Sequence, residues 1–365
     1  MRTAFLLVVA LHALIHLLGF TKAFALREVR ELSMDTSRPM GIAWLMATLL
    51  FLAYAILEMT QNRYAWLVGF LAVLLSQILI IMFWKDAKFG TLPNILILAV
   101  SIMGYGSYRF HNLVEKDTAR ILAQSSLARD KVISEADLDS LPKLVKKWLI
   151  SSGMIGKPSI RLGRVEQEAQ MKMKPGQEDW MNATATQYTV IDPPAFIWTT
   201  RVKMNPLLYF LGRDKFEEGR GKMLIRLNSL ISVVDASGEK IDEGSLQRYL
   251  GELVWFPSLA LSPYITWEAI DGSSAKATME YMGTRGSGTF YFNEDGDFER
   301  FSAMRFQGNE PEAERREWVI EATDYKVFEG IRVPSEMRAT WKLDQGDWTW
   351  LKMKILDIDY TIGLE

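Results

Sequence analysis

Long uncharged hydrophobic runs dominate the first part of the chain. Four runs of 17 to 21 residues contain no Asp, Glu, Lys or Arg: 3–20, 40–57, 64–84 and 92–108. A helix needs about 20 mainly apolar residues to cross the hydrocarbon core of a bilayer. Arg2 precedes the first run, but no small-x-small cleavage site follows it, so we interpret this run as a retained helix. The pattern predicts a four-helix transmembrane domain over residues 1–110.

The hydrophobic period changes twice after the last of these runs. Residues 111–157 are polar with helical spacing, which predicts a helical linker. From residue 159 apolar and polar positions alternate, and tight-turn pairs such as Asp295-Gly296 and Glu329-Gly330 separate the runs. Roughly ten strands joined in this way predict an antiparallel β-rich domain over residues 158–365. The predicted fold class is α+β, with a curved sheet or half-barrel and one or two packed helices, one of them from the stretch DEGSLQRYLGELVWF.

Apolar residues in this second part exceed what one face of a sheet requires. Residues 195–198 and 348–351 are apolar on both strand faces, and the clusters 206–211 and 254–261 have the composition of exposed apolar loops. Such a surplus predicts an apolar groove or a rim that faces the membrane. The alternative is that the helix and the loops fill the concave face completely.

Composition excludes several chemistries. The chain has no cysteine, and its three histidines all lie within the first 111 residues, so the β-rich domain has no thiol nucleophile, Cys/His zinc site or imidazole base. It also lacks a P-loop, and a net charge of −2 gives no signal for nucleic acid. Carboxylates remain as the enzymatic option, namely Asp214, Glu217, Glu218, Asp235, Asp242, Glu243 and Glu252. We predict no catalytic residue, metal or cofactor, and whether the chain is an enzyme stays open.

Arginines close to the apolar clusters suggest a second kind of site. A guanidinium beside a groove can hold the phosphate or carboxylate of a lipid while the groove takes its tail. The alternative for Arg248 and Glu252, four apart on the predicted helix, is that they only pair with each other. The candidate ligand-binding residues are Trp198, Arg201, Arg213, Arg220, Arg248, Glu252, Trp255 and Phe256.

His12 and His16 lie one helical turn apart within the first apolar run. Ionisable residues within a membrane usually face a bundle interior or a wet cavity. Two interpretations stay open: a metal, haem or quinone site, or neutral imidazoles that hydrogen-bond to neighbouring helices.

Basic residues between the predicted spans bear on their orientation. The first and third connections carry six, Lys22, Arg27, Arg30, Arg38, Lys85 and Lys88, and the opposite side carries five, Arg2, Arg63, Arg109, Lys116 and Arg120. The positive-inside rule then places the β-rich domain on the extracytoplasmic side of a bacterial inner membrane.

Several stretches resemble a known family. They are HALIHLLGFTKAF, WKDAKFGTLPNILIL, VIDPPAFIWTTRVKMNPLLYFLGRDKFEEGRGKMLIRL and VDASGEKIDEGSLQRYLGELVWFPSLAL, and they resemble the DUF6544 (DUF6920-like) family of bacterial membrane proteins, for which no activity is known. Separately, VFEGIRVPSEMRATWKL and GDWTWLKMKILDIDY are similar to the last strands of LolA-like lipoprotein-sorting folds, curved sheets that enclose acyl chains. The second resemblance implies a fold and assigns no site.

The sequence thus favours a membrane-anchored binding protein for a lipid, an acylated protein or another apolar ligand. Alternatives are a membrane-bound redox component that binds quinone or haem, a carboxylate-based hydrolase, and an assembly or sensor protein. The expected partners are the lipid membrane and a lipid or lipoprotein ligand, without nucleic acid, and the oligomeric state stays open.

Overall fold

The computed structural model describes residues 2–125, 131–205 and 208–361. Two compact units divide the chain. The first comprises Met1–Leu113 with Asn228–Leu230, and the second comprises Val114–Leu227 with Ile231–Glu365.

The first unit is helical. Its helices are α1 (Arg2–Ala23), α2 (Arg38–Met59), α3 (Ala65–Met82), the short α4 (Trp84–Ala87) and η1 (Lys88–Gly90), and the first part of α5 (Thr91–Ala123). Four segments are long and apolar enough to cross a membrane, which confirms the four predicted apolar helices. The helices pack closely: a Cβ added at Gly19 of α1 would lie 2.2 Å from the Trp44 ring of α2. Close approach at small residues is typical of helix contacts in membranes.

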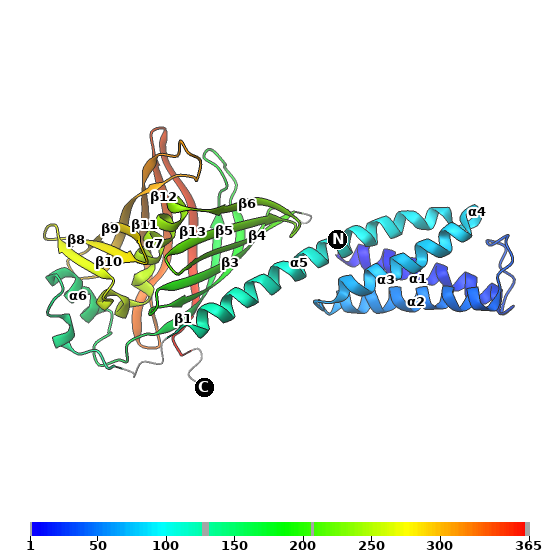
Figure 1. Cartoon of the computed structure of the whole chain (residues 1–365), viewed down its shortest axis with the longest axis horizontal. Coiled ribbons are helices and arrows are strands. Elements are labelled where there is room, and N and C mark those ends of the chain that lie inside the picture. Colours follow the sequence, from blue (N-terminus) through cyan, green and yellow to red (C-terminus); the bar gives the residue numbers. More distant parts are fainter. Residues whose placement is uncertain (1, 126–130, 206–207, 362–365) are drawn as a thin grey trace. The chain divides into compact units, whose positions relative to one another are not determined.

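α5 runs from the first unit into the second (Figure 1). The apolar run behind the fourth span ends at residue 108, whereas the helix continues to Ala123. The extension has its own apolar side, because Ile121 is fully buried against Val190, Ala195 and Ile197. Beyond it lie η2 (Glu135–Leu138) and α6 (Lys143–Ser151), which Pro142 caps at its N-terminus. Residues 126–130 of the predicted linker lie outside the described residues.

One 13-stranded sheet forms the body of the second unit. Its strands are β1 (Leu162–Met171), β2 (Met181–Val190), β3 (Ala195–Lys203), β4 (Tyr209–Glu217), β5 (Arg220–Leu227), β6 (Ile231–Ser237), β7 (Ile265–Ala269), β8 (Ser274–Tyr281), β9 (Thr284–Phe292), β10 (Phe298–Phe306), β11 (Arg315–Phe328), β12 (Ile331–Leu343) and β13 (Gly346–Asp359). The spatial order is β6-β5-β4-β3-β2-β1-β13-β12-β11-β10-β9-β8-β7, and all neighbouring pairs are antiparallel. The sheet is therefore two meanders joined where β1 pairs with β13.

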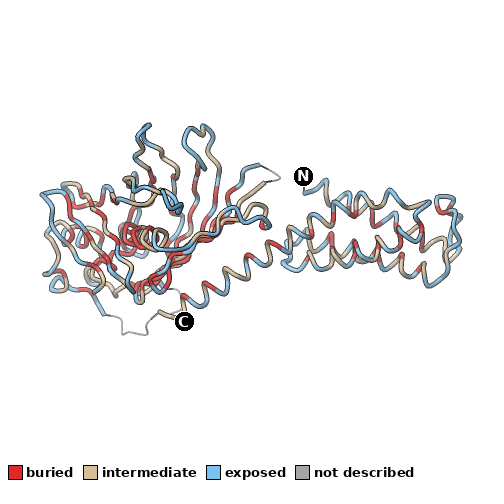
Figure 2. The backbone as a smooth tube through the Cα atoms, turned by 45° about the horizontal axis from the view of Figure 1, so that its top comes forward, coloured by how far each residue is buried: buried red, intermediate tan, exposed pale blue. Residues whose placement is uncertain are grey.

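The connection between the two edge strands makes the sheet curve. β6 and β7 lie at opposite edges, and α7 (Glu239–Gly251), η3 (Glu252–Trp255) and η4 (Pro257–Leu261) link them. α7 packs against β5 near one edge and β9 near the other. Strands lie about 4.8 Å apart, so these two would be about 40 Å apart in a flat sheet, too far for one helix to reach. The sheet is curved and unclosed around α7, whose buried side forms the centre of the core (Figures 1 and 2).

The predicted α+β class is confirmed, and two local predictions are wrong. The cluster 206–211 does not form an apolar loop: Pro206 and Leu207 lie outside the described residues, and residues 209–211 begin β4. The cluster 254–261 is not exposed, because η3 and η4 bury almost all of it in the core. The strands exceed the expected ten, since β4 was not foreseen and residues 220–237 fold into two strands, β5 and β6.

Candidate functional site

A cavity of about 600 Å³ lies between α7 and the concave face of the sheet. We call it the concave cavity. Its volume is within the range of small-molecule sites, about 300–1,000 Å³. Lining residues come from strands of both meanders and from α7, so the curvature of the sheet creates the space.

Tryptophan and methionine dominate the apolar wall. Strand alternation directs every second side chain of β11, β12 and β13 to the concave face, and this brings together Trp318, Trp341 and Trp348, while a bulge in β13 adds Trp350. Met337 and Met353 lie between them, and Val234 and Ile225 face them from the other meander. Flexible methionines beside flat rings suit a ligand of variable shape.

A cluster of charges lies where α7 faces β4. Arg248 donates from Nη1 to Asp214 at 2.7 Å, from Nε to Glu252 at 2.7 Å, and from Nη2 to the Gln187 amide oxygen at 2.9 Å. Its guanidinium also lies 5.0 Å from the Trp198 ring centroid. The expected Arg248–Glu252 pair is present, but it belongs to a largely buried cluster in which Arg248 has two carboxylate partners.

Arg305 of β10 lines the same cavity without such partners. Its guanidinium lies 4.1 Å from the Trp318 ring centroid, and its Nε is buried without a hydrogen-bond partner. Within the part of the chain that the structure describes, the side chain of Arg305 forms no hydrogen bond or ion pair. Burial lowers the pKa of Arg305 to about 10, so the group is still charged at neutral pH. Sequence reasoning missed this residue, although Phe301, Ala303 and Arg305 share one strand face and the first two are apolar.

Four of the eight predicted ligand-binding residues line the cavity with their side chains. Trp198, Arg248 and Glu252 do so, as does Trp255, whose indole N–H donates to the Pro334 carbonyl at 3.1 Å.

The other four lie elsewhere. Arg201 is exposed on the opposite face of β3 and stacks on Tyr209, and Arg220 is exposed at the start of β5. Phe256 is buried in the core against Tyr360. Arg213 borders the cavity, but its guanidinium pairs with Asp117 of α5 on the convex side.

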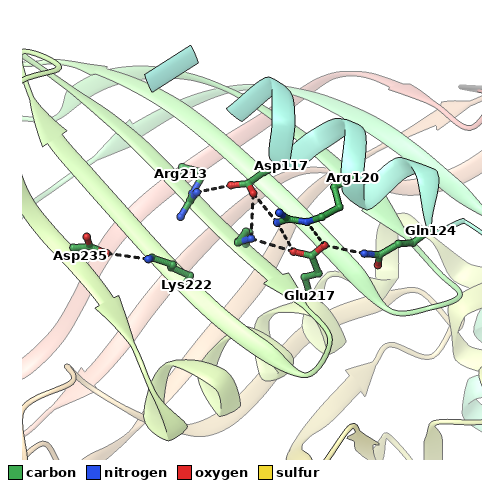
Figure 3. Close-up of polar contacts among 8 residues, drawn as sticks. Asp117, Arg120, Gln124, Arg213, Glu217, Lys222 and Asp235 are labelled. Carbon is green, nitrogen blue, oxygen red and sulfur yellow. Dashed lines mark hydrogen bonds and ion pairs between the residues drawn. The ribbon is translucent and has the colours of Figure 1, made fainter. Parts of the chain in front are cut away.

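Arg213 belongs to a network of charges on the convex face, drawn in Figure 3. We call it the convex network, and it joins the end of α5 to β4. Arg120 binds Glu217 with two hydrogen bonds, at 2.8 and 2.7 Å, and also contacts Asp117 at 2.6 Å. Lys215 lies 3.3 Å from Asp117 and 3.0 Å from Glu217. Three cations thus surround two carboxylates.

Glu217 shows the electrostatic effect of this arrangement. Burial alone would raise the pKa of its carboxyl group, but hydrogen bonds from Arg120 and Lys215 outweigh burial and lower the pKa to about 2. The carboxylate is therefore held charged. Asp117 and Glu217 have the ion-pair partners of a structural network, and neither faces the concave cavity.

His12 and His16 are buried between helices of the first unit. His12 Nε2 lies 2.9 Å from the Asn94 side-chain oxygen, and His16 Nε2 lies 2.8 Å from Ser76 Oγ. His16 Nδ1 lies 2.8 Å from the His12 carbonyl oxygen. These contacts are those expected of imidazoles that pack between polar groups of neighbouring helices. Among the described residues, no three His, Asp or Glu side chains gather in a way that could hold a metal ion.

The fold is a helical unit with four candidate membrane spans followed by a curved antiparallel β unit that holds the cavity. The chain belongs to DUF6544, a family of unknown function, whose pattern matches residues 131–353. Among solved structures, it is similar to the crystal structure of a LolA superfamily protein from Nitrosomonas europaea, with 8% identity and a TM-score of 0.30, over 59% of this chain and 92% of that one. No curated protein sequence matches.

Proposed function

We propose that this chain is a membrane-anchored binding protein that takes the apolar chain of a lipid, or of an acylated protein, into the concave cavity. The observation that carries the proposal is the cavity itself, about 600 Å³ of space with a mainly apolar wall beside the hydrophobic core of the β unit. Apolar surface of this kind gains about 25 cal/mol per Å² when a ligand removes it from water.

The four candidate spans support the membrane part of the proposal. We infer that the chain crosses a bacterial inner membrane four times, with the β unit on the extracytoplasmic side, because six basic residues flank the other side against five on this one. Alkaline phosphatase and green fluorescent protein fusions at the C-terminus test the orientation. Active phosphatase with a dark fluorescent fusion is expected, and the reverse pattern would contradict it.

Photolabelling tests the binding site. The purified full chain in phosphatidylcholine nanodiscs is irradiated with decanol that carries a diazirine in its chain, and adducts are located by peptide mass spectrometry. We expect adducts on the tryptophan-bearing peptides of β11 to β13. Decanol dissolved in the bilayer labels the helices of the first unit whether or not the cavity binds it. Labels confined to those helices would therefore show that the cavity is not occupied and would contradict the proposal.

Matched variants of β6 sharpen this experiment. Val234→Phe adds a ring to the cavity wall, whereas Ile231→Phe changes an exposed position on the same strand. We expect the first to reduce labelling of β11 to β13 several-fold and the second to leave it unchanged. Equal labelling of both variants would mean that the label does not occupy the cavity.

A further inference from the structure

The donors and acceptors around the concave cavity are unevenly matched. The carboxylate of Glu252 is engaged on both oxygens, by Arg248 and by Gln187. Asp214 accepts from Arg248 with one oxygen, and its other oxygen has no partner. The nitrogens Nε, Nη1 and Nη2 of Arg248 therefore all donate to acceptors within the chain. The guanidinium of Arg305 has no such acceptor among the described residues.

Other polar atoms of the lining show the same bias. Apart from Arg213, whose guanidinium lies on the convex side, the buried atoms of cavity-lining residues without a partner are all donors except for Asp214 Oδ1: Arg305 Nε, Trp318 Nε1, Trp348 Nε1 and Trp350 Nε1. A buried donor without an acceptor is rare, because it loses its hydrogen bonds to water and gains none. The carboxylates of Asp214, Glu252 and Glu243 attract Arg305 through space, but no acceptor oxygen of the described residues forms a hydrogen bond with its guanidinium.

The position of Arg305 indicates where acceptor atoms would bind. Its guanidinium stacks on Trp318 and lies 6.0 Å from the Trp341 ring centroid. It also lies beneath α7, since a Cβ added at Gly244 would come 3.1 Å from Nη2. Residue 244 is glycine, and this lets the helix approach the guanidinium closely. The planar donor fork of arginine matches carboxylate and phosphate oxygens.

The geometry points to an anionic amphiphile as the ligand: its carboxylate or phosphate group pairs with Arg305, and its single acyl chain lies along Trp318, Trp341 and Trp350. This deepens the proposed function and rests on it. The anionic group supplies an acceptor for the Arg305 guanidinium, which forms no side-chain hydrogen bond or ion pair with the described residues.

A competition assay tests the head group separately from the tail. Diazirine decanol labels the cavity of the full chain in phosphatidylcholine nanodiscs at pH 8, and unlabelled decanoate, decyl phosphate, decanol or inorganic phosphate competes. A charge-assisted hydrogen bond strengthens binding by about 10-fold or more. We expect decanoate and decyl phosphate to compete at about 10-fold lower concentration than decanol, and inorganic phosphate not to compete.

Arg305→Gln is expected to remove the preference for the anions while decanol still competes. The matched control is Arg300→Gln, which changes an exposed arginine on the same strand that also stacks on an aromatic ring, at 4.0 Å from Tyr291. This control should keep the preference. Partition of each competitor into the disc is the same for all variants, so only differences between variants report on the site. Arg305→Lys keeps the charge and is expected to keep part of the preference.

The outcomes separate the two proposals. Equal competition by decanol and decanoate in the wild type, or a preference that survives in Arg305→Gln, overturns the assignment of Arg305 and leaves the apolar site standing. Competition by inorganic phosphate as strong as that by decyl phosphate would show a site for free anions and overturn the amphiphile. Absence of any cavity label refutes the proposed function itself. The wild-type comparison remains decisive if Arg305→Gln does not fold.

Discussion

Two arginines of the same sheet have opposite surroundings. Arg213 of β4 is 3% exposed and pairs with Asp117, which Arg120 and Lys215 also contact. Arg305 of β10 is half-buried on the concave face, and no described residue forms a hydrogen bond or ion pair with its side chain. A buried charge with complete partners is strongly destabilising only when a partner is removed, whereas one without partners costs free energy unless something outside the chain pairs with it. The difference distinguishes a structural cluster from a candidate binding site.

The largest loss of stability is expected when the convex network is broken. Asp117→Asn leaves the buried Arg213 without its carboxylate, and breaking a buried pair in this way should lower the free energy of unfolding by about 3–5 kcal/mol. Denaturant unfolding of the full chain in nanodiscs, followed by tryptophan fluorescence, measures the change.

Asp235→Asn is the matched control, because Asp235 and Lys222 form an exposed pair at 3.6 Å in the same region of the sheet (Figure 3). Exposed pairs contribute about 0–1 kcal/mol. Similar losses for the two variants would show that the convex network is no more than a surface cluster.

Acid should weaken the convex network next most strongly. The pKa of Glu217 is lowered from its ordinary 4.5 to about 2. The stability that the charged Glu217 gives the fold is therefore complete above pH 4.5, and it is lost as the pH falls from 4.5 to about 2. By linkage, this group alone loses about 2 kcal/mol between pH 6 and pH 3.

Unfolding midpoints measured across this pH range should fall less steeply in Glu217→Gln than in the wild type. Parallel curves for the two chains would contradict the assignment of a depressed pKa to Glu217.

The smallest change in the free energy of unfolding is expected from substitution of Arg305, and this change is an increase instead of a decrease. Burial lowers the pKa of Arg305 to about 10, so the charged form costs free energy in the folded chain at every pH below that value. Arg305→Met removes this cost but also the stacking on Trp318, and the balance should raise the free energy of unfolding by about 1 kcal/mol when no amphiphile is bound. Calorimetric or denaturant unfolding after delipidation measures it. A loss of 3 kcal/mol or more would show that Arg305 is a structural residue like Arg213.

Periodicity predicted most of the fold. The four spans, the switch to alternating strands and the amphipathic helix α7 all follow from local spacing, and each is present. β4 was missed for a physical reason. Its charged residues Arg213, Asp214 and Glu217 indicate a solvated surface, yet all three are buried, because α5 and α7 bring their partners from distant parts of the chain.

The candidate site was predictable only in part. The apolar surplus at residues 195–198 and 348–351 predicted a groove. Of these residues, Trp198, Trp348, Trp350 and Leu351 line the cavity and the others do not. Which arginine lacks a partner could not be predicted, because that depends on side chains from strands far apart in sequence. Arg305 lies on the same face of its strand as the apolar Phe301, and this could have been noticed in the sequence. That its guanidinium stacks on Trp318 and has no side-chain hydrogen bond follows only from the curvature of the sheet around α7.

A crystal structure of the full chain with decanoate brominated at its tail tests the central claim most directly. The account predicts an anomalous bromine peak beside Trp341 and Trp350, with the carboxylate within hydrogen-bonding distance of Arg305. A cavity that stays free of bromine at saturating decanoate, or a chain bound with its carboxylate turned away from Arg305, would contradict it.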